Sequence, residues 1–313
     1  MKNIYKNSSL NLARAKKILM KNNIIGLPTE TVYGLAGNAY SNNAVKKIYK
    51  LKKRPKINPL IIHYYNLRLL KKDAFLSEKF LKLYKKFSPG PLTYILKKRK
   101  NSKISSLANA NLKTIAVRFP QNRIIRKLLG NLKFPLAIPS ANLSSAVSPV
   151  CSNDVLDEFG KKLSFILDGG KCKIGLESTV VNLNKKIQIL RPGAISAKEI
   201  NKILREKVYF SNKSNKVISP GMTKKHYSPG IPIELNSKKM DDKAACIVFG
   251  KRYNNQKNIF NLSKKGSLEE AARNLYKTLR KIKKKGFKKI KVVKIPKSRI
   301  GIAINDRLKK AAN

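Results

Sequence analysis

Short apolar runs alternate with amphipathic helical patterns along this chain, and this alternation most restricts what it can fold into. Apolar residues at a 3.6-residue spacing predict helices, and short bounded apolar runs predict buried strands. Helices are predicted to begin near Ser8, Ser41, Ser77 and Ser196. The predicted strands are 24–27, 60–63, 92–96, 114–119, 136–139, 164–167, 178–183 and 187–190. Because helices and strands intermix, we expect an α/β fold.

A polar stretch divides the chain. Residues 209–218 are rich in Asn, Ser and Lys and have no apolar period, which is typical of a linker. Beyond it, a strand at 244–249, a helix opened by the capping box Ser267 and Glu270, and a strand at 291–295 predict a small βαβ unit with parallel strands. A length of 313 residues suits two domains. The expected boundaries are 1–207 for the first domain, 208–230 for the linker and 231–313 for a small C-terminal α/β domain.

The charge of the chain is strongly positive. Seventy Lys and Arg residues against 16 Asp and Glu residues give a net charge of +54. This excludes an acidic binding protein and favours nucleic acid, an anionic membrane surface or small anionic substrates as partners. Because most of the cations are lysines spread along the whole chain, we interpret most of them as a solvated surface. No apolar run reaches the length of a membrane span, and we expect no membrane partner.

The cysteines and histidines limit the redox and metal chemistry. Cys151, Cys172 and Cys246 are an odd, widely spaced set, which indicates reduced thiols in a cytoplasmic protein rather than disulfides. His63 and His226 are the only histidines, so a structural zinc site of Cys and His has no plausible ligand set. We expect any metal to arrive with a substrate.

Hydroxyl, amide and cationic residues cluster in loops after the predicted strands, where open α/β sheets bind ligands. Neither a phosphate loop of the G-x-x-x-x-G-K-[ST] type nor a nucleophile elbow occurs. The segment 28–35 offers hydroxyl groups for a polar ligand, although a Thr-rich turn explains it equally well. Lys52 and Arg54 either cap a helix or neutralise phosphate. The glycines of 168–170 and 175 favour an anion-binding nest, and 219–229 is too rich in Pro, His and Tyr for a solvated linker, which suggests a loop that closes over a ligand.

Taken in order, the motifs resemble the threonylcarbamoyl-AMP synthase family. They are PTETVYGL, KRP with NPLIIH, SPGPLT, TIAVRFP, PSAN, SPV, DGG, GLESTVV, LRPG and SPGMTKKHYSP. The resemblance covers about residues 10–205 strongly, and the remainder resembles the long form of the family. It implies a YrdC-like twisted open mixed sheet, with helices forming a basic concave pocket, and a small C-terminal Rossmann-like α/β domain.

The resemblance also implies a reaction and a set of site residues. L-threonine, bicarbonate or CO2, and ATP with Mg²⁺ would give L-threonylcarbamoyl-AMP and pyrophosphate, and a downstream threonylcarbamoyl transfer complex would use the product to modify tRNA. The threonine-binding residues would be Thr31, His63, Arg118, Ser140 and Ser178. The ATP-binding residues would be Arg54, Asn58, Thr114, Asn142, Ser148, Arg191 and His226. The expected catalytic group is Lys52, Arg54, Ser140 and Asn142. Glu30 and Glu177 would order the site, and neither is expected to bind metal.

Two positions depart from the family pattern, and three alternatives remain. Lys53 and Ser88 stand where the family usually has Gly and Trp. A carbamoyl-AMP-forming enzyme of hydrogenase maturation would carry additional zinc-finger Cys pairs, which this chain lacks. A basic double-stranded RNA-binding module would bind RNA without turning over ATP, and the positive charge also predicts weak electrostatic RNA binding by an enzyme. An inactive structural relative would have broken pocket residues, and here they are intact.

Overall fold

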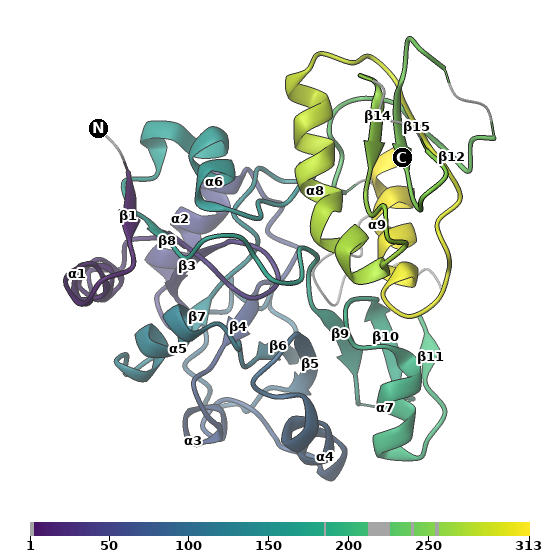
Figure 1. Cartoon of the computed structure of the whole chain (residues 1–313). Helices are drawn as coiled ribbons and strands as arrows, with labels where there is room; N and C mark the ends of the chain where they lie inside the picture. The colour runs from purple at the N-terminus through teal and green to yellow at the C-terminus, as the bar shows by residue number, and fades with distance from the viewer. Residues whose placement is uncertain (1–2, 185, 212–225, 239–240, 254–256) are drawn as a thin grey trace.

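The computed structural model describes residues 3–184, 186–211, 226–238, 241–253 and 257–313. It contains an 11-stranded sheet and a separate 4-stranded sheet, each with helices packed beside it (Figure 1). This confirms the expected α/β class and the twisted mixed sheet. The strands of the larger sheet come first in the sequence, and those of the smaller sheet follow.

Parallel and antiparallel pairs mix in the larger sheet. Its strand order is β1-β8-β2-β3-β7-β4-β6-β5-β9-β10-β11. The strands are β1 (Ile4–Lys6), β2 (Ile25–Leu27), β3 (Gly34–Asn38), β4 (Ile61–His63), β5 (Leu92–Lys97), β6 (Thr114–Arg118), β7 (Leu136–Ala137), β8 (Ile166–Asp168), β9 (Thr179–Asn182), β10 (Gln188–Arg191) and β11 (Tyr209–Phe210). The central pair β4 and β6 is parallel, whereas β5 runs antiparallel to β6.

Serine caps fix where several helices begin. The helices of this half are α1 (Ser9–Met20), α2 (Asn42–Lys52), α3 (Leu67–Leu70), α4 (Glu78–Phe87), α5 (Arg123–Gly130), α6 (Ser152–Phe159) with the short 3₁₀ turn η1 (Gly160–Lys162), and α7 (Ala197–Leu204). Ser8, Ser41 and Ser77 each accept a hydrogen bond from the amide three residues on, as the sequence predicts. Ser196 and Glu199 form the complete capping box that was expected before α7.

The smaller sheet is wholly parallel, with strand order β12-β15-β13-β14. Its elements are β12 (Ile233–Leu235), β13 (Ala245–Val248), β14 (Ile259–Asn261), α8 (Leu268–Lys284), β15 (Ile290–Val292) and α9 (Gly301–Ala312). The predicted parallel pair, β13 and β15, is confirmed. The expected capping box is only half present: Ser267 accepts from the Glu270 amide at 3.2 Å, but the Glu270 carboxylate accepts from Ser263 Oγ at 2.5 Å.

Several elements were not predicted from the sequence. The segment 28–35 was expected to be a loop, but β3 begins at Gly34 because its residues pair with β2 and β7. The expected linker begins with β11, which extends the larger sheet beside β10. Neither β1, β12, β14 nor α9 was foreseen. Residues 212–225, which include most of the expected linker and its motif from Ser219 to Lys225, lie outside the described residues.

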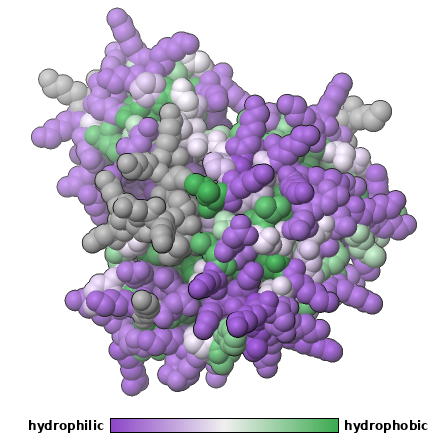
Figure 2. Space-filling view, turned by 180° about the vertical axis from the view of Figure 1, so that it is seen from behind, coloured by the Kyte–Doolittle hydropathy of each residue, from purple (hydrophilic) through white to green (hydrophobic). Residues whose placement is uncertain are grey.

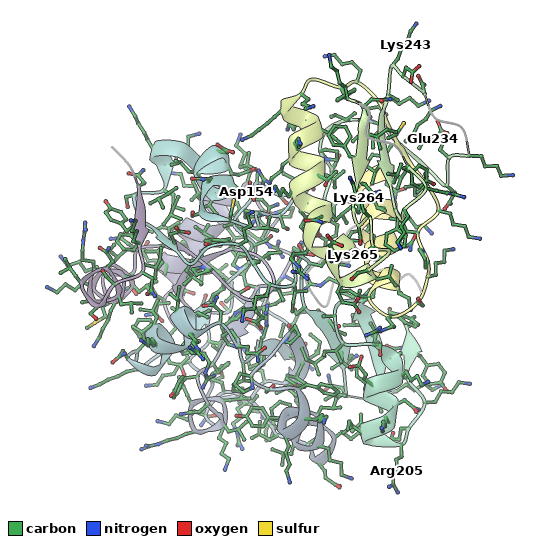
Figure 3. The ribbon with its side chains drawn as sticks, in the orientation of Figure 1. Asp154, Arg205, Glu234, Lys243, Lys264 and Lys265 are labelled. Atoms are coloured by element: carbon green, nitrogen blue, oxygen red, sulfur yellow. The ribbon has the colours of Figure 1, made fainter. Side chains whose placement is uncertain are left out.

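Lysines and arginines cover the outer surface, as expected. Arg205 and Lys243 point outward at opposite ends of the molecule, and Lys264 and Lys265 are exposed before α8 (Figure 3). Hydrophilic residues dominate the rear face as well, whereas hydrophobic residues gather near its centre (Figure 2). Among the described residues, none of the helices combines the length and the apolar character that a membrane span requires.

Candidate active site

Three neighbouring strands place polar side chains side by side in the larger sheet. Arg118 ends β6, and its register partners are His63 on β4 and Thr93 on β5. Residues in register on neighbouring strands share a face of the sheet, so these three side chains line one row. Thr93 Oγ1 lies 2.7 Å from Ser178 Oγ, which continues the row toward β9. Thr93 was not predicted as a site residue, although it ends the SPGPLT motif.

Arg118 connects the segment 28–35 to this row of side chains. Its guanidinium donates to Glu30 Oε1 at 2.7 Å, to Thr31 Oγ1 at 2.9 Å and to the Gly90 carbonyl at 3.3 Å. The Glu30 carboxylate also accepts from the amides of Gln121 and Asn122. A buried cation with a paired carboxylate is held in one geometry, and its two remaining N–H groups can bind a further acceptor. The predicted pair Thr31 and Arg118 is therefore brought together, with Glu30 fixing the arginine.

His63 is buried and uncharged beside Arg118. Burial, and then the neighbouring positive charge of Arg118, hold the pKa of His63 well below its usual value. Its Nδ1 lies 3.2 Å from the Ile61 carbonyl, which fixes the proton on Nδ1. Its Nε2 is buried and has no hydrogen-bond partner among the described residues, so it is an acceptor suited to a ligand N–H or O–H.

Lys52 connects the end of α2 to the loop after β7. Its Nζ donates to the Ser140 carbonyl at 2.5 Å and to the Asn142 carbonyl. Its side chain is almost fully buried, and burial, with Arg54 next, lowers its pKa well below the usual value. Ser140 and Asn142 thus meet Lys52 through backbone oxygens rather than side chains. The Asn142 amide nitrogen donates to the carbonyls of Leu143 and Ala146.

Arg54 and Asn58 form one buried unit, and Thr114 lies elsewhere. Arg54 donates to the carbonyl and to Oδ1 of Asn58 at 3.0 and 2.5 Å, and to the Pro59 carbonyl at 2.9 Å. Burial is the main cause that lowers the pKa of Arg54 to about 10, and Arg191 lowers it further. Thr114 is at the start of β6, about 13 Å along the strand from Arg118, so the structure does not bring it to the row around Arg118.

Arg191 and Ser178 pair across β10 and β9. Arg191 donates through Nε to the Ser178 carbonyl at 3.1 Å and through Nη2 to Ser178 Oγ at 3.0 Å. The turn after Arg191 is tight, because a Cβ on Gly193 would lie 2.3 Å from the Thr179 amide nitrogen. This close approach explains why glycine follows the arginine and proline, and it fixes Arg191 against Ser178.

Glu177 links the larger sheet to the C-terminal helices. Its Oε1 accepts from Ser148 Oγ at 2.6 Å, and its Oε2 accepts from Tyr276 at 2.8 Å and from Arg307 at 2.9 Å. Burial alone would raise the pKa of Glu177, but the charges of Arg307 and Arg191 and the Ser148 hydroxyl hold it at about 2. Sequence reasoning identified Glu177 as an ordering residue and missed Arg307, which lies in no motif.

The described end of the linker motif lies beside these cations. His226 is 9% exposed, its ring centroid lies 4.0 Å from that of Tyr227 in a tilted contact, and its amide donates to the Lys310 carbonyl at 3.1 Å. Burial lowers the pKa of His226 to about 3; Glu177 opposes this shift, and Arg54, Lys52 and Arg191 add to it. His226 therefore lies close enough to Lys52, Arg54 and Arg191, which the family resemblance places at ATP, to be affected by their charges.

The three glycine amides of the predicted anion-binding nest bond within the protein. The amide of Gly169 donates to Tyr33 Oη at 3.0 Å, and the amide of Gly170 donates to Asp168 Oδ1 at 3.1 Å. The amide of Gly175 donates to the Thr31 carbonyl at 3.0 Å. Because these donors are engaged within the protein, they are not aimed at a ligand. At Gly175, φ is +81°, and a Cβ would lie 2.6 Å from the Cα of Arg273 on α8. The absence of a side chain at Gly175 therefore allows α8 of the C-terminal half to pack closely against this loop.

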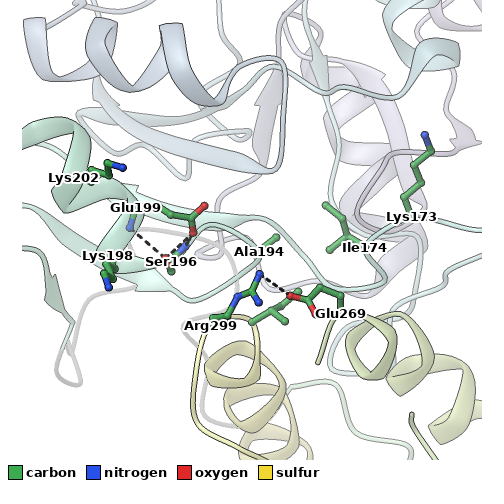
Figure 4. Close-up of a pocket in the computed structure, with 10 residues that line it drawn as sticks. Lys173, Ile174, Ala194, Ser196, Lys198, Glu199, Lys202, Glu269 and Arg299 are labelled. Carbon is green, nitrogen blue, oxygen red and sulfur yellow. Dashed lines mark hydrogen bonds and ion pairs between the residues drawn. The ribbon is translucent and has the colours of Figure 1, made fainter. Parts of the chain in front are cut away.

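A separate cavity of about 680 Å³ lies between α7 and the start of α9 (Figure 4). Its cations include Lys173, Lys198, Lys202 and Arg299, and Arg299 pairs with Glu269 at 3.1 Å. None of the predicted site residues lines it. It is therefore distinct from the row around Arg118 and from the cations around His226.

The carboxylates of the site do not suit a metal. Glu30 and Glu177 each accept three hydrogen bonds from protein donors. Within the described part of the chain, no group of three His, Cys, Asp or Glu side chains could hold a metal ion.

Fold and site together define an α/β enzyme whose buried cations are arranged for anionic substrates. Residues 17–193 match the family model described as "Telomere recombination", the Sua5, YciO and YrdC domain, and residues 195–313 match "Threonylcarbamoyl-AMP synthase, C-terminal domain". The threonylcarbamoyl-AMP synthase of Pyrococcus abyssi is 34% identical, with 95% of this chain and 93% of the relative covered. That of Bacillus subtilis is 33% identical, with 96% and 92% covered.

A solved structure agrees with these relatives. The crystal structure of Pyrococcus abyssi Sua5 complexed with L-threonine superposes with a TM-score of 0.90 at 32% identity, covering 99% of this chain and 96% of that one. Escherichia coli YciO, at 23% identity and a TM-score of 0.57, shares the fold over 64% of this chain. The chain belongs to the threonylcarbamoyl-AMP synthase family.

Proposed function

We propose that this enzyme makes L-threonylcarbamoyl-AMP and pyrophosphate from L-threonine, bicarbonate or CO2, and ATP. Membership of the family gives the reaction. The observation that carries the proposal is the buried cluster of Lys52, Arg54 and Arg191 facing His226, next to the row that contains Arg118. Buried cations that lower the pKa values of their neighbours favour a polyanion such as a triphosphate.

The row on β4, β6 and β9 suits the amino acid. Arg118 would bind the threonine carboxylate with its two remaining N–H groups. His63 Nε2 would accept from the threonine hydroxyl or amine, since its neutral ring has a free lone pair. Thr31, Ser140 and Ser178 would complete this subsite, with Thr93 holding Ser178.

The cation cluster suits ATP. Arg54 and Arg191 would bind phosphate oxygens, and Lys52 would add positive charge beside them. The nucleotide contacts would come from Asn58, Thr114, Asn142, Ser148 and His226. Because Thr114 is about 13 Å from Arg118, it would contact a part of the nucleotide remote from threonine.

The chemistry needs no protein nucleophile. The threonine nitrogen adds to CO2 and loses a proton, which gives a carbamate. A carbamate oxygen then attacks the α-phosphorus of ATP while the bond to pyrophosphate breaks. Holding the two substrates in line and neutralising the developing charge carries this step, and Lys52, Arg54, Ser140 and Asn142 surround the place where it would occur.

The remaining expectations follow from the reaction. Mg²⁺ would enter as the counter-ion of ATP, and the product would pass to a separate transfer complex that modifies tRNA. The free thiols Cys151, Cys172 and Cys246 suit a cytoplasmic enzyme. We assign catalysis to residues 1–207, and we expect residues 231–313 to hold the catalytic loops in position. The expected loop that closes over a ligand lies mostly outside the described residues, and its described residue His226 lies beside the cations.

Pyrophosphate release tests this proposal. The wild-type enzyme should release pyrophosphate from ATP and Mg²⁺ only when L-threonine and bicarbonate are both present. Arg118→Lys keeps the positive charge that faces Glu30 but loses the guanidinium that can bind a carboxylate in a bidentate manner. The KM for L-threonine should therefore rise by about tenfold or more. Lys284→Met, which removes an exposed ion pair with Asp157, serves as a control and should release pyrophosphate at the wild-type rate.

Two outcomes would contradict the proposal. Release that is indifferent to threonine would favour a carbamoyl-AMP-forming enzyme. No release at all, together with tight and salt-sensitive RNA binding, would favour the RNA-binding alternative.

A further inference from the structure

We propose that Arg307, on α9 of the C-terminal half, is a positioning residue for the ATP side of the active site. The inference rests on the proposed function and adds a residue that lies in none of the sequence motifs. In this proposal the C-terminal half fixes the relative positions of three loops near the substrates, because one buried guanidinium contacts all three.

Arg307 touches three loops of the larger half. It is fully buried, and its Nε donates to Glu177 Oε2 at 2.9 Å. Its Nη2 donates to the Pro192 carbonyl at 3.0 Å. Its guanidinium carbon lies 5.0 Å from the centre of the Tyr227 ring, a cation–π contact. Figure 1 shows α9 above β9 and β10; Glu177 comes just before β9, and Pro192 directly follows β10.

Each of the three contact residues of Arg307 is bonded to, or adjacent in sequence to, a residue that we propose binds ATP. Glu177 accepts from Ser148 Oγ at 2.6 Å. Pro192 follows Arg191, and Tyr227 follows His226. Arg307 itself lies behind these residues, so it would act through them rather than on the substrate. A buried arginine with donors in a rigid fork is suited to fixing several partners at once.

The neighbours of Arg307 hold it in place. Asp306 Oδ2 accepts from its Nη1 at 2.5 Å, and Tyr276 shares Glu177 Oε2 at 2.8 Å. The rings of Tyr227 and Tyr276 stack with centroids 5.8 Å apart. Asp306 thus holds the guanidinium from within the C-terminal half, independently of the three loops.

Two variants separate positioning from simple stability. In Arg307→Lys, Glu177 keeps a charged partner, but one ammonium group cannot serve all three loops. In the double variant Glu177→Gln/Arg307→Met, both charges are removed at similar volume, which avoids an unpaired buried charge. The control is Lys284→Met/Asp157→Asn, which removes another ion pair between the two halves but contacts none of the three loops.

The readouts are binding of a non-hydrolysable ATP analogue and the KM values for ATP and L-threonine, measured on proteins that unfold cooperatively. Both Arg307 variants should weaken analogue binding and raise the KM for ATP by about tenfold, while the KM for L-threonine stays within about twofold. The control should match the wild type. Wild-type ATP binding in both variants, or equal rises in both KM values, would overturn the proposal. If the wild-type protein binds the analogue but shows no threonine-dependent release, the proposed function fails and the binding comparison still tests Arg307.

Discussion

At the scale of single residues, the site is built from buried groups whose charges are set by their surroundings. His63 and His226 are the only histidines, and the structure keeps both uncharged by burial beside cations. Glu177, by contrast, stays charged because the charges of Arg307 and Arg191 hold its pKa at about 2. The sequence identified these three residues but could not predict their protonation, because protonation depends on burial and on partners distant in sequence.

Acid should destabilise the protein through these histidines. The pKa of His226 is about 3 in the folded state and about 6.5 when unfolded, so the unfolded state binds more protons between these values. The contribution of His226 to the free energy of unfolding is therefore fully present above pH 6.5 and is lost as the pH falls below this value. It should amount to about 2 kcal/mol between pH 7.5 and pH 5, and His63 acts in the same direction.

Urea unfolding at several pH values measures this effect. In His226→Gln, the free energy of unfolding should fall less between pH 7.5 and pH 5 than in the wild type. Carboxylates contribute little in this range, because even Glu177, with a pKa of about 2, begins to lose its contribution only below about pH 4.5. Parallel pH profiles for the two proteins would show that His226 is not buried in its neutral form.

At the scale of elements, local signals were predictable and long-range pairing was not. Ser8, Ser41, Ser77 and Ser196 cap helices because a cap depends on residues within one turn. β3 was missed because its residues, Gly34–Asn38, have little strand character and are held by neighbours on both sides. β1 pairs with β8 across more than 150 residues, and no local pattern reports such a partner.

The end of α2 illustrates how one substitution at a cap is tolerated. Lys53, which stands where the family usually has glycine, has φ 50° and ψ 41°, the left-handed conformation that glycine adopts without strain. The lysine side chain is exposed. Sequence comparison flagged the position, and the structure gives its backbone geometry.

Lys53→Gly should therefore stabilise the protein by about 0.5–1 kcal/mol, since relief of left-handed strain exceeds the entropy that glycine loses. Lys53→Ala keeps the Cβ and should give no such gain. Arg205, which ends α7 with φ 55°, offers a second site for the same comparison. Urea denaturation measures each change, and equal stability of the glycine and alanine variants would contradict the strain argument.

At the scale of the whole molecule, the site depends on both halves of the chain. The motifs up to Arg191 contain the residues that the structure brings together around Arg118 and around His226, and their assignment to threonine and ATP stays a prediction. They could not reveal that Glu177 is held from α8 and α9, because Tyr276 and Arg307 are about 100 and 130 residues away and follow no pattern. Sequence motifs identify residues that bind substrate more readily than the distant residues that hold those motifs in position.

The net charge of +54 should produce RNA binding that is independent of the active site. Its cations, such as Lys243, Lys264 and Lys265, are exposed and lie outside the row and the cluster. Binding by about six phosphate contacts should weaken by about 10²–10³-fold between 50 and 200 mM salt, because counterions released on binding make the affinity depend on salt.

Fluorescence anisotropy with a labelled single-stranded RNA measures this binding. Arg191→Ala removes a buried cation of the ATP side and should leave RNA affinity unchanged, whereas Lys264→Glu/Lys265→Glu should weaken it through like-charge repulsion. Saturating ATP should not compete. If Arg191→Ala or ATP abolished RNA binding, the RNA would occupy the active site itself. The surface charge would then serve recognition of a specific substrate rather than general attraction.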